Sequence, residues 1–179
     1  MITVGVFCGS SRGAGEVYAK AAQEAARLLV ERGCRVVYGG GKVGLMGVVA
    51  EVALAAGGHV TGVTTARLLE REVMHHGLSE LHSVDSMHER KSMMTRLADA
   101  FLILPGGYGT LDELFEVLTL QQLGVHDKQY GLLNVNGFFD GLIRFLDQSV
   151  CEGMLQRSNR DLLQVGADLP DLLTKIGAV

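Results

Sequence analysis

The sequence has few cysteines, and their arrangement argues against two classes of small protein. Only Cys8, Cys34 and Cys151 are present, and no two of them form a CxxC pair. A disulfide framework needs paired cysteines and a zinc ribbon needs CxxC motifs, so neither is expected. This cysteine usage favours a reducing compartment, and we expect the protein in the cytoplasm.

Basic residues and long apolar runs are also scarce. The 16 Lys and Arg residues are outnumbered by 20 Asp and Glu residues, which gives a net charge of −4 with His neutral. Proteins that bind nucleic acid usually carry a basic excess, so no nucleic-acid partner is expected. No apolar run approaches the roughly 18 residues of a membrane-spanning helix. The first residues, MITVGVFCGSSRG, lack the basic segment of a signal peptide. No membrane association is therefore expected.

What the sequence does contain is an alternation of two patterns. A single domain is expected over residues 1–179, because domains average roughly 150 residues. Short apolar runs predict strands and helical spacing of apolar residues predicts helices. The strands are predicted at 2–8, 34–38, 59–64, 100–104, 130–135 and 162–165, the helices at 15–32, 44–56, 86–98, 111–123, 138–150 and 169–176, and a short helix and strand within 66–84. This order predicts an α/β fold, a parallel sheet with helices on both faces.

Glycine is the residue in excess, with 24 glycines against two prolines. Many of them fall in three segments that each follow a predicted strand, at 8–15, 39–47 and 106–109. The carboxyl ends of parallel strands meet at one edge of a sheet, and ligands of such sheets bind there. Three glycine-rich loops at one edge predict a phosphate or nucleotide site.

Two common nucleotide motifs are missing from these loops. No GxGxxG follows the first strand, and the second strand ends in Tyr38 and Gly39 without a carboxylate for a ribose hydroxyl, so NAD is not expected. The one Gly-Lys pair, Gly41-Lys42, is followed by Val43 instead of Ser or Thr. Hydrolysis of a nucleoside triphosphate is therefore not expected either.

The most informative motif is PGGYGTLDE, at 105–113. Its glycines let backbone N–H groups approach an anion, and Thr110 is predicted at the start of a helix, whose N-terminus attracts phosphate. Glu113 would then lie one turn into the helix, near the sugar of a phosphorylated ligand. A structural alternative is equally open, because Thr110-x-x-Glu113 also has the spacing of a capping box.

Two further segments suggest ligand contacts. In His88-Glu89-Arg90-Lys91, two cations lie early in a predicted helix, where the helix dipole disfavours them and a bound anion would offset the cost. The alternative is a solvated helix end. The second segment, GGGKVGLMG at 39–47, includes Gly41 and has more glycines than a turn requires. They could let a base or sugar lie against the backbone, although a tight turn accounts for one or two of them.

Together these segments resemble the LOG family, the cytokinin riboside 5′-monophosphate phosphoribohydrolases, earlier labelled lysine decarboxylases. The resemblance rests on GGGKVGLMG, VDSMHERK, ADAFLILPGGYGTLDELFEVLT and QLGVHDKQYGLLNVNGFFDGL, and it spans nearly the whole chain. It implies a Rossmann-like fold, a homodimer, and hydrolysis of the N-glycosidic bond of N6-prenylated adenosine 5′-monophosphate or AMP. The products would be the free base, a cytokinin in the first case, and ribose 5-phosphate. No cofactor is implied.

The resemblance also implies roles for individual residues. Arg90 and Glu113 match the family's catalytic positions. The positions expected to bind the nucleotide are Ser10, Gly41, Glu72, Met87, Lys91, Gly107, Tyr108, Gly109, Thr110, Leu111, Asp112 and Thr119. One departure concerns the base: family members often carry an aromatic residue just before the QLG segment, where this chain has Leu120 and Gln121. The preference for a prenyl group therefore stays open.

The chemistry of the proposed reaction fits these residue types. Breaking the bond between C1′ and N9 develops oxocarbenium character, and the Glu113 carboxylate could stabilise that charge, orient the ribose hydroxyls or position water. Arg90, with Lys91, would hold the phosphate and orient the sugar. The unphosphorylated nucleoside should then be rejected.

Two other interpretations remain. A non-catalytic carrier of a nucleotide or of molybdenum cofactor would keep the glycine-rich phosphate cradle but would not need both Arg90 and Glu113. His75 and His76 could suggest a metal, but no third ligand has suitable spacing, so no metal site is expected.

Overall fold

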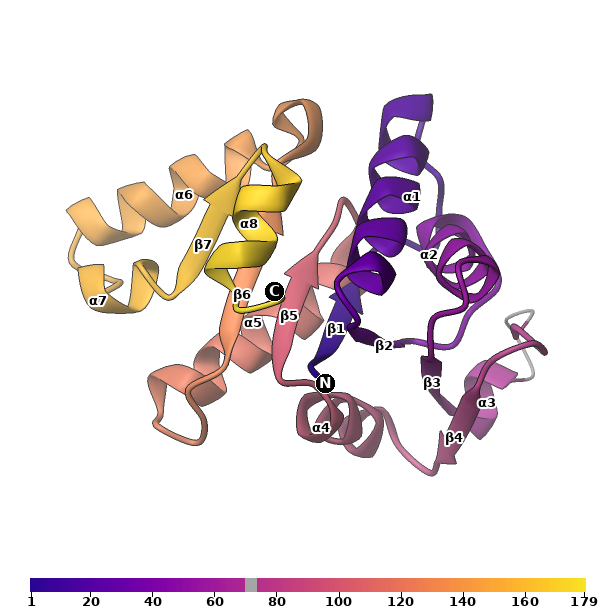
Figure 1. The fold of residues 1–179 in the computed structure, drawn as a ribbon. Helices are drawn as coiled ribbons and strands as arrows, with labels where there is room; N and C mark the ends of the chain where they lie inside the picture. The colour runs from indigo at the N-terminus through magenta and orange to yellow at the C-terminus, as the bar shows by residue number, and fades with distance from the viewer. Residues whose placement is uncertain (70–73) are drawn as a thin grey trace.

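The computed structural model describes residues 1–69 and 74–179, and among them it places seven parallel strands in one sheet (Figure 1). The strand order is β4-β3-β2-β1-β5-β6-β7. The strands are β1 (Thr3–Phe7), β2 (Arg35–Tyr38), β3 (Val60–Thr65), β4 (Glu80–Val84), β5 (Ala100–Ile103), β6 (Gln129–Leu133) and β7 (Leu163–Gly166). The α/β fold and the parallel sheet predicted from the sequence are confirmed. Glu72 lies outside the described residues.

Helices cover both faces of the sheet, as predicted. One apolar core joins one face of the sheet to α1 (Glu16–Glu31), α2 (Gly44–Ala55) and α8 (Leu169–Lys175). A second core joins the other face to α4 (Met87–Leu97), α5 (Tyr108–Gln122) and α6 (Asp140–Cys151). Short elements complete the described chain: α3 (Ala66–Leu69), a 3-10 turn at Val135–Gly137 and α7 (Arg157–Arg160). Figure 1 shows α1 and α2 side by side.

Strand residues alternate between the two cores, which explains why the central strands β1 and β5 are almost wholly apolar. Val36 and Tyr38 face the first core, and Val37, between them, faces the second. A strand buried on both faces has no polar side to display. In the second core, the ring of Phe101 stacks between those of Phe7 and Tyr130, with centroids 5.2 and 5.4 Å away. These stacks tie β5 to its neighbours.

Two helix ends show how local sequence sets the geometry. Helix α1 is followed by Gly33 at φ +72°, the left-handed backbone that glycine adopts without strain. Helix α4 begins after Ser86, whose hydroxyl accepts a hydrogen bond from the Glu89 N–H at 3.1 Å. The Glu89 carboxylate in turn accepts one from the Asp85 N–H at 3.0 Å. These caps fix the first turn of α4, which carries Arg90.

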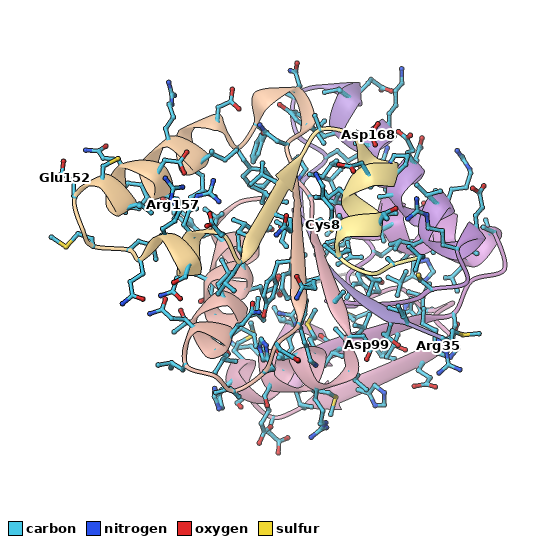
Figure 2. All side chains as sticks on the ribbon, turned by 60° about the vertical axis from the view of Figure 1, so that its left-hand side comes forward. Cys8, Arg35, Asp99, Glu152, Arg157 and Asp168 are labelled. Atoms are coloured by element: carbon cyan, nitrogen blue, oxygen red, sulfur yellow. The ribbon has the colours of Figure 1, made fainter. Side chains whose placement is uncertain are left out.

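The interior and the rim of the molecule differ as expected for a globular chain. Figure 2 shows Glu152 and Arg157 at the periphery, whereas Cys8, directly after β1, lies inside. Within the described ranges, no helix has the length and apolar character needed to cross a membrane.

Because all seven strands run the same way, the loops after β1, β2 and β5 lie at one edge of the sheet. The predicted site is at that edge.

Candidate active site

Arg90 and Glu113, predicted from two separate motifs, meet in the structure. The Nη1 group of Arg90, on α4, donates a hydrogen bond to Oε1 of Glu113, on α5, at 3.2 Å. The Nε group of Arg90 donates to the carbonyl oxygen of Val63, on β3, at 2.9 Å. Both charged side chains are largely buried, with 8% of Arg90 and 13% of Glu113 exposed. The solvated helix end that was the alternative for this segment is therefore wrong for Arg90.

The surroundings of Glu113 change its acidity. Burial raises its pKa from 4.5 to about 7. The Arg90 guanidinium and the Lys91 ammonium oppose that rise, and the Asp112 carboxylate adds to it. A carboxyl group with a pKa near neutrality can exchange a proton or present a negative charge at physiological pH. Glu113 is therefore a buried, titratable carboxyl group at the wall of a cavity.

The capping-box alternative for Glu113 is wrong in this structure. Helix α5 begins at Tyr108 and its N-cap is Gly107, so Thr110 lies inside the first turn and cannot serve as the cap. The predicted start at residue 111 was three residues late, because glycines rarely signal a helix. A Cβ atom at Gly106 would lie 2.0 Å from Oγ1 of Thr110 and 2.9 Å from the backbone nitrogen of Gly9. Glycine at this position lets the β1 and β5 loops approach the helix N-terminus.

A cavity of about 250 Å³ lies between these elements. Eight of the residues predicted from the sequence line it: Ser10, Met87, Arg90, Gly107, Tyr108, Gly109, Thr110 and Glu113. Sequence reasoning missed Cys8, Gly9, Met46 and Leu68, which line it as well. Cys8 was predicted as a small buried side chain, and it is buried. Burial and then the charge of Glu113 raise the pKa of its thiol, which disfavours the thiolate form.

Several predicted nucleotide-binding residues lie away from this cavity. Lys91 forms ion pairs with Asp112, at 3.0 Å, and with Glu116. Thr119 is exposed, and its hydroxyl donates to the carbonyl oxygen of Phe115 at 2.6 Å. Asp112, Phe115, Glu116 and Thr119 line a separate depression on the outer side of α5. Leu111 is half-buried and packs against the second core.

The glycines after β2 are enclosed by protein atoms. Gly41 pairs with Met74 in an isolated antiparallel bridge, and its carbonyl oxygen accepts a hydrogen bond from the Tyr38 hydroxyl at 3.2 Å. Gly40 has φ +81°, and a Cβ there would lie 2.7 Å from Cε of Met74. Gly41 does not line the cavity beside Arg90 and Glu113. For Gly40, the left-handed backbone and the contact with Met74 both account for glycine.

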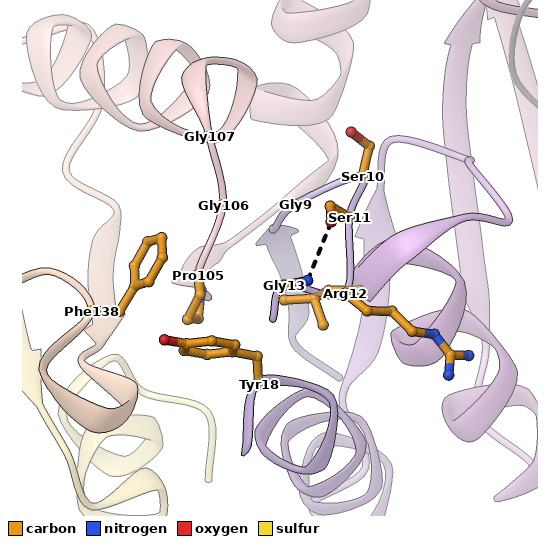
Figure 3. Close-up of a pocket in the computed structure, with 11 residues that line it drawn as sticks. Gly9, Ser10, Ser11, Arg12, Gly13, Tyr18, Pro105, Gly106, Gly107 and Phe138 are labelled. Atoms are coloured by element: carbon orange, nitrogen blue, oxygen red, sulfur yellow. Dashed lines mark hydrogen bonds between the residues drawn. The ribbon is translucent and has the colours of Figure 1, made fainter. Parts of the chain in front are cut away.

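A second cavity, of about 310 Å³, adjoins the first (Figure 3). The two share Gly9, Ser10 and Gly107. The rings of Tyr18, on α1, and Phe138 meet edge to face with centroids 5.6 Å apart, while Figure 3 shows the Arg12 side chain extending away from them. Sequence reasoning missed these aromatic residues because neither belongs to a glycine motif and they are distant in the chain.

A metal site needs several His, Cys, Asp or Glu side chains close together. Across residues 1–69 and 74–179, no group of three or more His, Cys, Asp or Glu side chains is placed to hold a metal ion.

Comparisons with known proteins identify close relatives. A family model described as "Possible lysine decarboxylase" matches residues 46–176. The cytokinin riboside 5′-monophosphate phosphoribohydrolase LOG of Oryza sativa subsp. japonica is 47% identical over 171 residues, which cover 96% of this chain and 71% of that protein. The phosphoribohydrolase LOG5 of Arabidopsis thaliana is 45% identical over 173 residues, covering 97% and 76%.

Solved structures support the fold alone. The X-ray structure of TM1055 aligns with a TM-score of 0.76 at 22% identity and covers 100% of both chains. The molybdenum cofactor carrier protein from Chlamydomonas reinhardtii aligns with a TM-score of 0.75 at 18% identity, covering 98% of this chain and 96% of that one. At such identities a shared fold does not carry a shared ligand.

Proposed function

The chain belongs to the LOG family of cytokinin riboside 5′-monophosphate phosphoribohydrolases, and from this premise we propose that it hydrolyses N6-prenylated adenosine 5′-monophosphate to the free base and ribose 5-phosphate, with AMP as a further substrate. The observation that carries the proposal is the buried pair of Arg90 and Glu113 beside the N-terminus of α5. A binding protein would need the glycine loop but not a carboxyl group whose pKa is raised to about 7.

We place the substrate phosphate at the start of α5. The first N–H groups of an α-helix have no partner within the helix, and the helix dipole favours an anion there. In α5 these groups belong to Tyr108, Gly109 and Thr110, which line the cavity. Arg90 is directed to Val63 and Glu113, so we assign it to the ribose end of the site instead of the phosphate.

The spacing along α5 then places the ribose. Glu113 lies five residues beyond Tyr108, about 7.5 Å along the helix axis at about 1.5 Å per residue. That span is comparable with a ribose measured from its 5′-phosphate to C1′. A phosphate held at the helix N-terminus therefore brings C1′ toward the Glu113 carboxylate. Phosphate contacts remote from the breaking bond supply orientation, so the nucleoside without phosphate should react poorly.

The reaction needs charge stabilisation at the sugar and a water molecule. As the bond between C1′ and N9 breaks, its electron pair leaves with the base and positive charge develops on the ribose. The Glu113 carboxylate stabilises that charge in a largely buried setting, where charge interactions are strong. Water adds to C1′, and its proton passes to the departing base. Arg90 holds the carboxylate in place and maintains a fraction of it in the ionised form.

The same proposal extends to assembly and location. We propose a homodimer, because Thr119 and Asp112 match nucleotide-binding positions of the family yet lie on the outer side of α5, away from this chain's own cavity. Substrate contact by those residues requires a second copy placed against α5. Light scattering after size exclusion should give the mass of two chains, and a monomer at micromolar concentration would contradict this.

We assign residues 1–179 to one nucleotide-binding domain and expect a cytoplasmic protein without nucleic-acid or membrane partners.

The direct test is an incubation with AMP, N6-isopentenyl-AMP and the two matching nucleosides. Free base is measured by chromatography, and ribose 5-phosphate by a coupled assay. Base released from the monophosphates alone supports the proposal, and the ratio of the two rates measures the prenyl preference. Nucleotide binding without release of base would reject hydrolysis and favour a carrier of a nucleotide or a related cofactor.

A further inference from the structure

The first glycine after β2 lies against the catalytic arginine. A Cβ atom built on Gly39 would be 2.3 Å from Nη2 of Arg90 and 3.2 Å from Sδ of Met46. Ordinary contacts to a Cβ atom begin near 3.4 Å. Gly39 does not have the left-handed backbone of its neighbour Gly40, so no positive φ requires glycine there. Space, and not backbone freedom, is what requires glycine at position 39.

Arg90 has little freedom to yield that space. Its Nε group is bonded to the Val63 carbonyl, and its Nη1 group is bonded to the Glu113 carboxylate. The guanidinium therefore lies in a slot with three sides, a carbonyl on β3, a carboxylate on α5 and the bare backbone at the end of β2. An added methyl group at position 39 would displace the guanidinium by about 1 Å, and at least one of these bonds would be lengthened.

We propose that Gly39 is a positioning residue for the reaction, and that its missing side chain forms the slot that holds the Arg90 guanidinium against the Glu113 carboxylate. This inference rests on the proposed function for its catalytic consequence, although the geometry is independent of it. It also gives the first glycine of GGGKVGLMG a role, since Gly39 lines neither of the two cavities.

The effect of a substitution should fall on activity more than on folding. The atom that must move is the end of an arginine side chain, and the other close atom belongs to a flexible methionine. No backbone atom lies within 3.4 Å of the added Cβ among its three nearest neighbours. A displacement of about 1 Å in a catalytic constellation can reduce turnover by about a hundredfold.

The substitution should also change the titration of Glu113. The charged and titratable groups around Glu113 are Arg90 and Lys91 on α4, Asp112 and Glu116 on α5, and Cys8 after β1. Of these, Arg90 exerts the largest lowering effect on the pKa of Glu113. Moving the guanidinium away weakens that effect, so the pKa of Glu113 should rise further.

The experiment compares Gly39→Ala with wild type and with two glycine controls. A Cβ at Gly141, on α6, meets open space, and a Cβ at Gly131, on β6, meets Leu172 at 2.9 Å in the core. Gly39→Ala should reduce kcat by about a hundredfold with a small change in KM, keep a Tm near that of wild type, and move the pH midpoint of activity upward. Gly141→Ala should leave kcat and the midpoint unchanged. Gly131→Ala should lower the Tm without moving the midpoint.

Two further measurements separate the possible failures. The Glu113 carboxyl can be titrated by NMR in wild type and Gly39→Ala, which needs no activity. If wild type released no base, the proposed function would fail, while an upward shift of this titration in Gly39→Ala would still support the slot. If Gly39→Ala folds poorly, the Tm of Arg90→Met is compared with the Tm of the double variant Gly39→Ala/Arg90→Met. Equal Tm values support the slot, because the added methyl group then has no guanidinium to clash with. A wild-type kcat and an unmoved Glu113 titration in Gly39→Ala would overturn the inference, as would a double variant with a Tm well below that of Arg90→Met.

Discussion

Replacing Glu113 with glutamine should lower the activity and raise the stability of the protein, and the structure sets the expected size of both effects. The amide oxygen of glutamine can still accept the hydrogen bond that Arg90 donates, so the shape of the site is kept and only the negative charge is lost. If the carboxylate stabilises the positive charge on the ribose, kcat should fall by about two to four orders of magnitude.

Stability should change in the opposite direction. A pKa of about 7 in the folded chain, against 4.5 as the ordinary value, means that folding favours the protonated carboxyl group. Stability is therefore lost as the pH rises from about 4.5 to 7, to a total of about 3 kcal/mol. Glutamine resembles the protonated form at every pH, so this loss is absent from the variant. Between about pH 5.5 and 8.5 the variant should gain about 2 kcal/mol on wild type.

Thermal melts of the two proteins at several pH values provide the assay. For a chain of this length, about 2 kcal/mol corresponds to a widening of the Tm gap by about 4–8 °C. The reasoning would be refuted by a gap that does not widen with pH, because Glu113 would then titrate normally. Retained hydrolysis in Glu113→Gln would refute the catalytic role itself. Circular dichroism before each melt confirms that both proteins start folded.

Three further outcomes follow from the same geometry. In wild type, kcat/KM should rise with pH through a midpoint near 7, because the ionised Glu113 is the active form. A flat pH profile would argue against this. The substrate phosphate has its own pKa of about 6, so the pH dependence of kcat alone is measured as a control. Arg90→Lys should reduce kcat and raise that midpoint, since one ammonium group cannot reproduce the geometry of the planar guanidinium at Val63 and Glu113; an unchanged midpoint would contradict it. Ser86→Ala should destabilise the protein by about 1 kcal/mol through loss of the α4 cap, measured by denaturant unfolding, and an unchanged midpoint of unfolding would show that the cap is dispensable.

Local patterns in the sequence predicted most of the fold. The apolar run at 100–104 became β5, and the glycine at position 33 ended α1, since both features act over a few neighbouring residues. The three glycine-rich loops lie at one edge because parallel strands all point the same way, a consequence of the alternating order of elements. The motif at 105–113 also predicted a glycine-rich loop that leads into a helix, and the structure has α5 beginning there.

What the sequence could not predict depends on contacts between distant segments. Thr110 and Glu113 have the spacing of a capping box, and only the position of α5 relative to α4 shows that Glu113 turns to Arg90 instead. Gly39 was interpreted as part of a surface for a base or sugar, because a local motif does not reveal its contact with Arg90, 51 positions later in the chain. The aromatic pair of Tyr18 and Phe138 was missed for the same reason.

The position of β1 at the centre of the sheet has a consequence for how the protein is made. β1 leaves the ribosome first and can pair with β2 early, but its other neighbour is β5, and the Thr3 N–H bonds to the Asp99 carboxylate 96 residues later. Until β5 emerges, one edge of β1 stays open, and open strand edges invite pairing with other chains. Synthesis must also reach α5 before Glu113 can meet Arg90. A nascent chain that stops short of α5 therefore lacks the Arg90–Glu113 pair, and a chain that pauses before β5 leaves one edge of β1 unpaired.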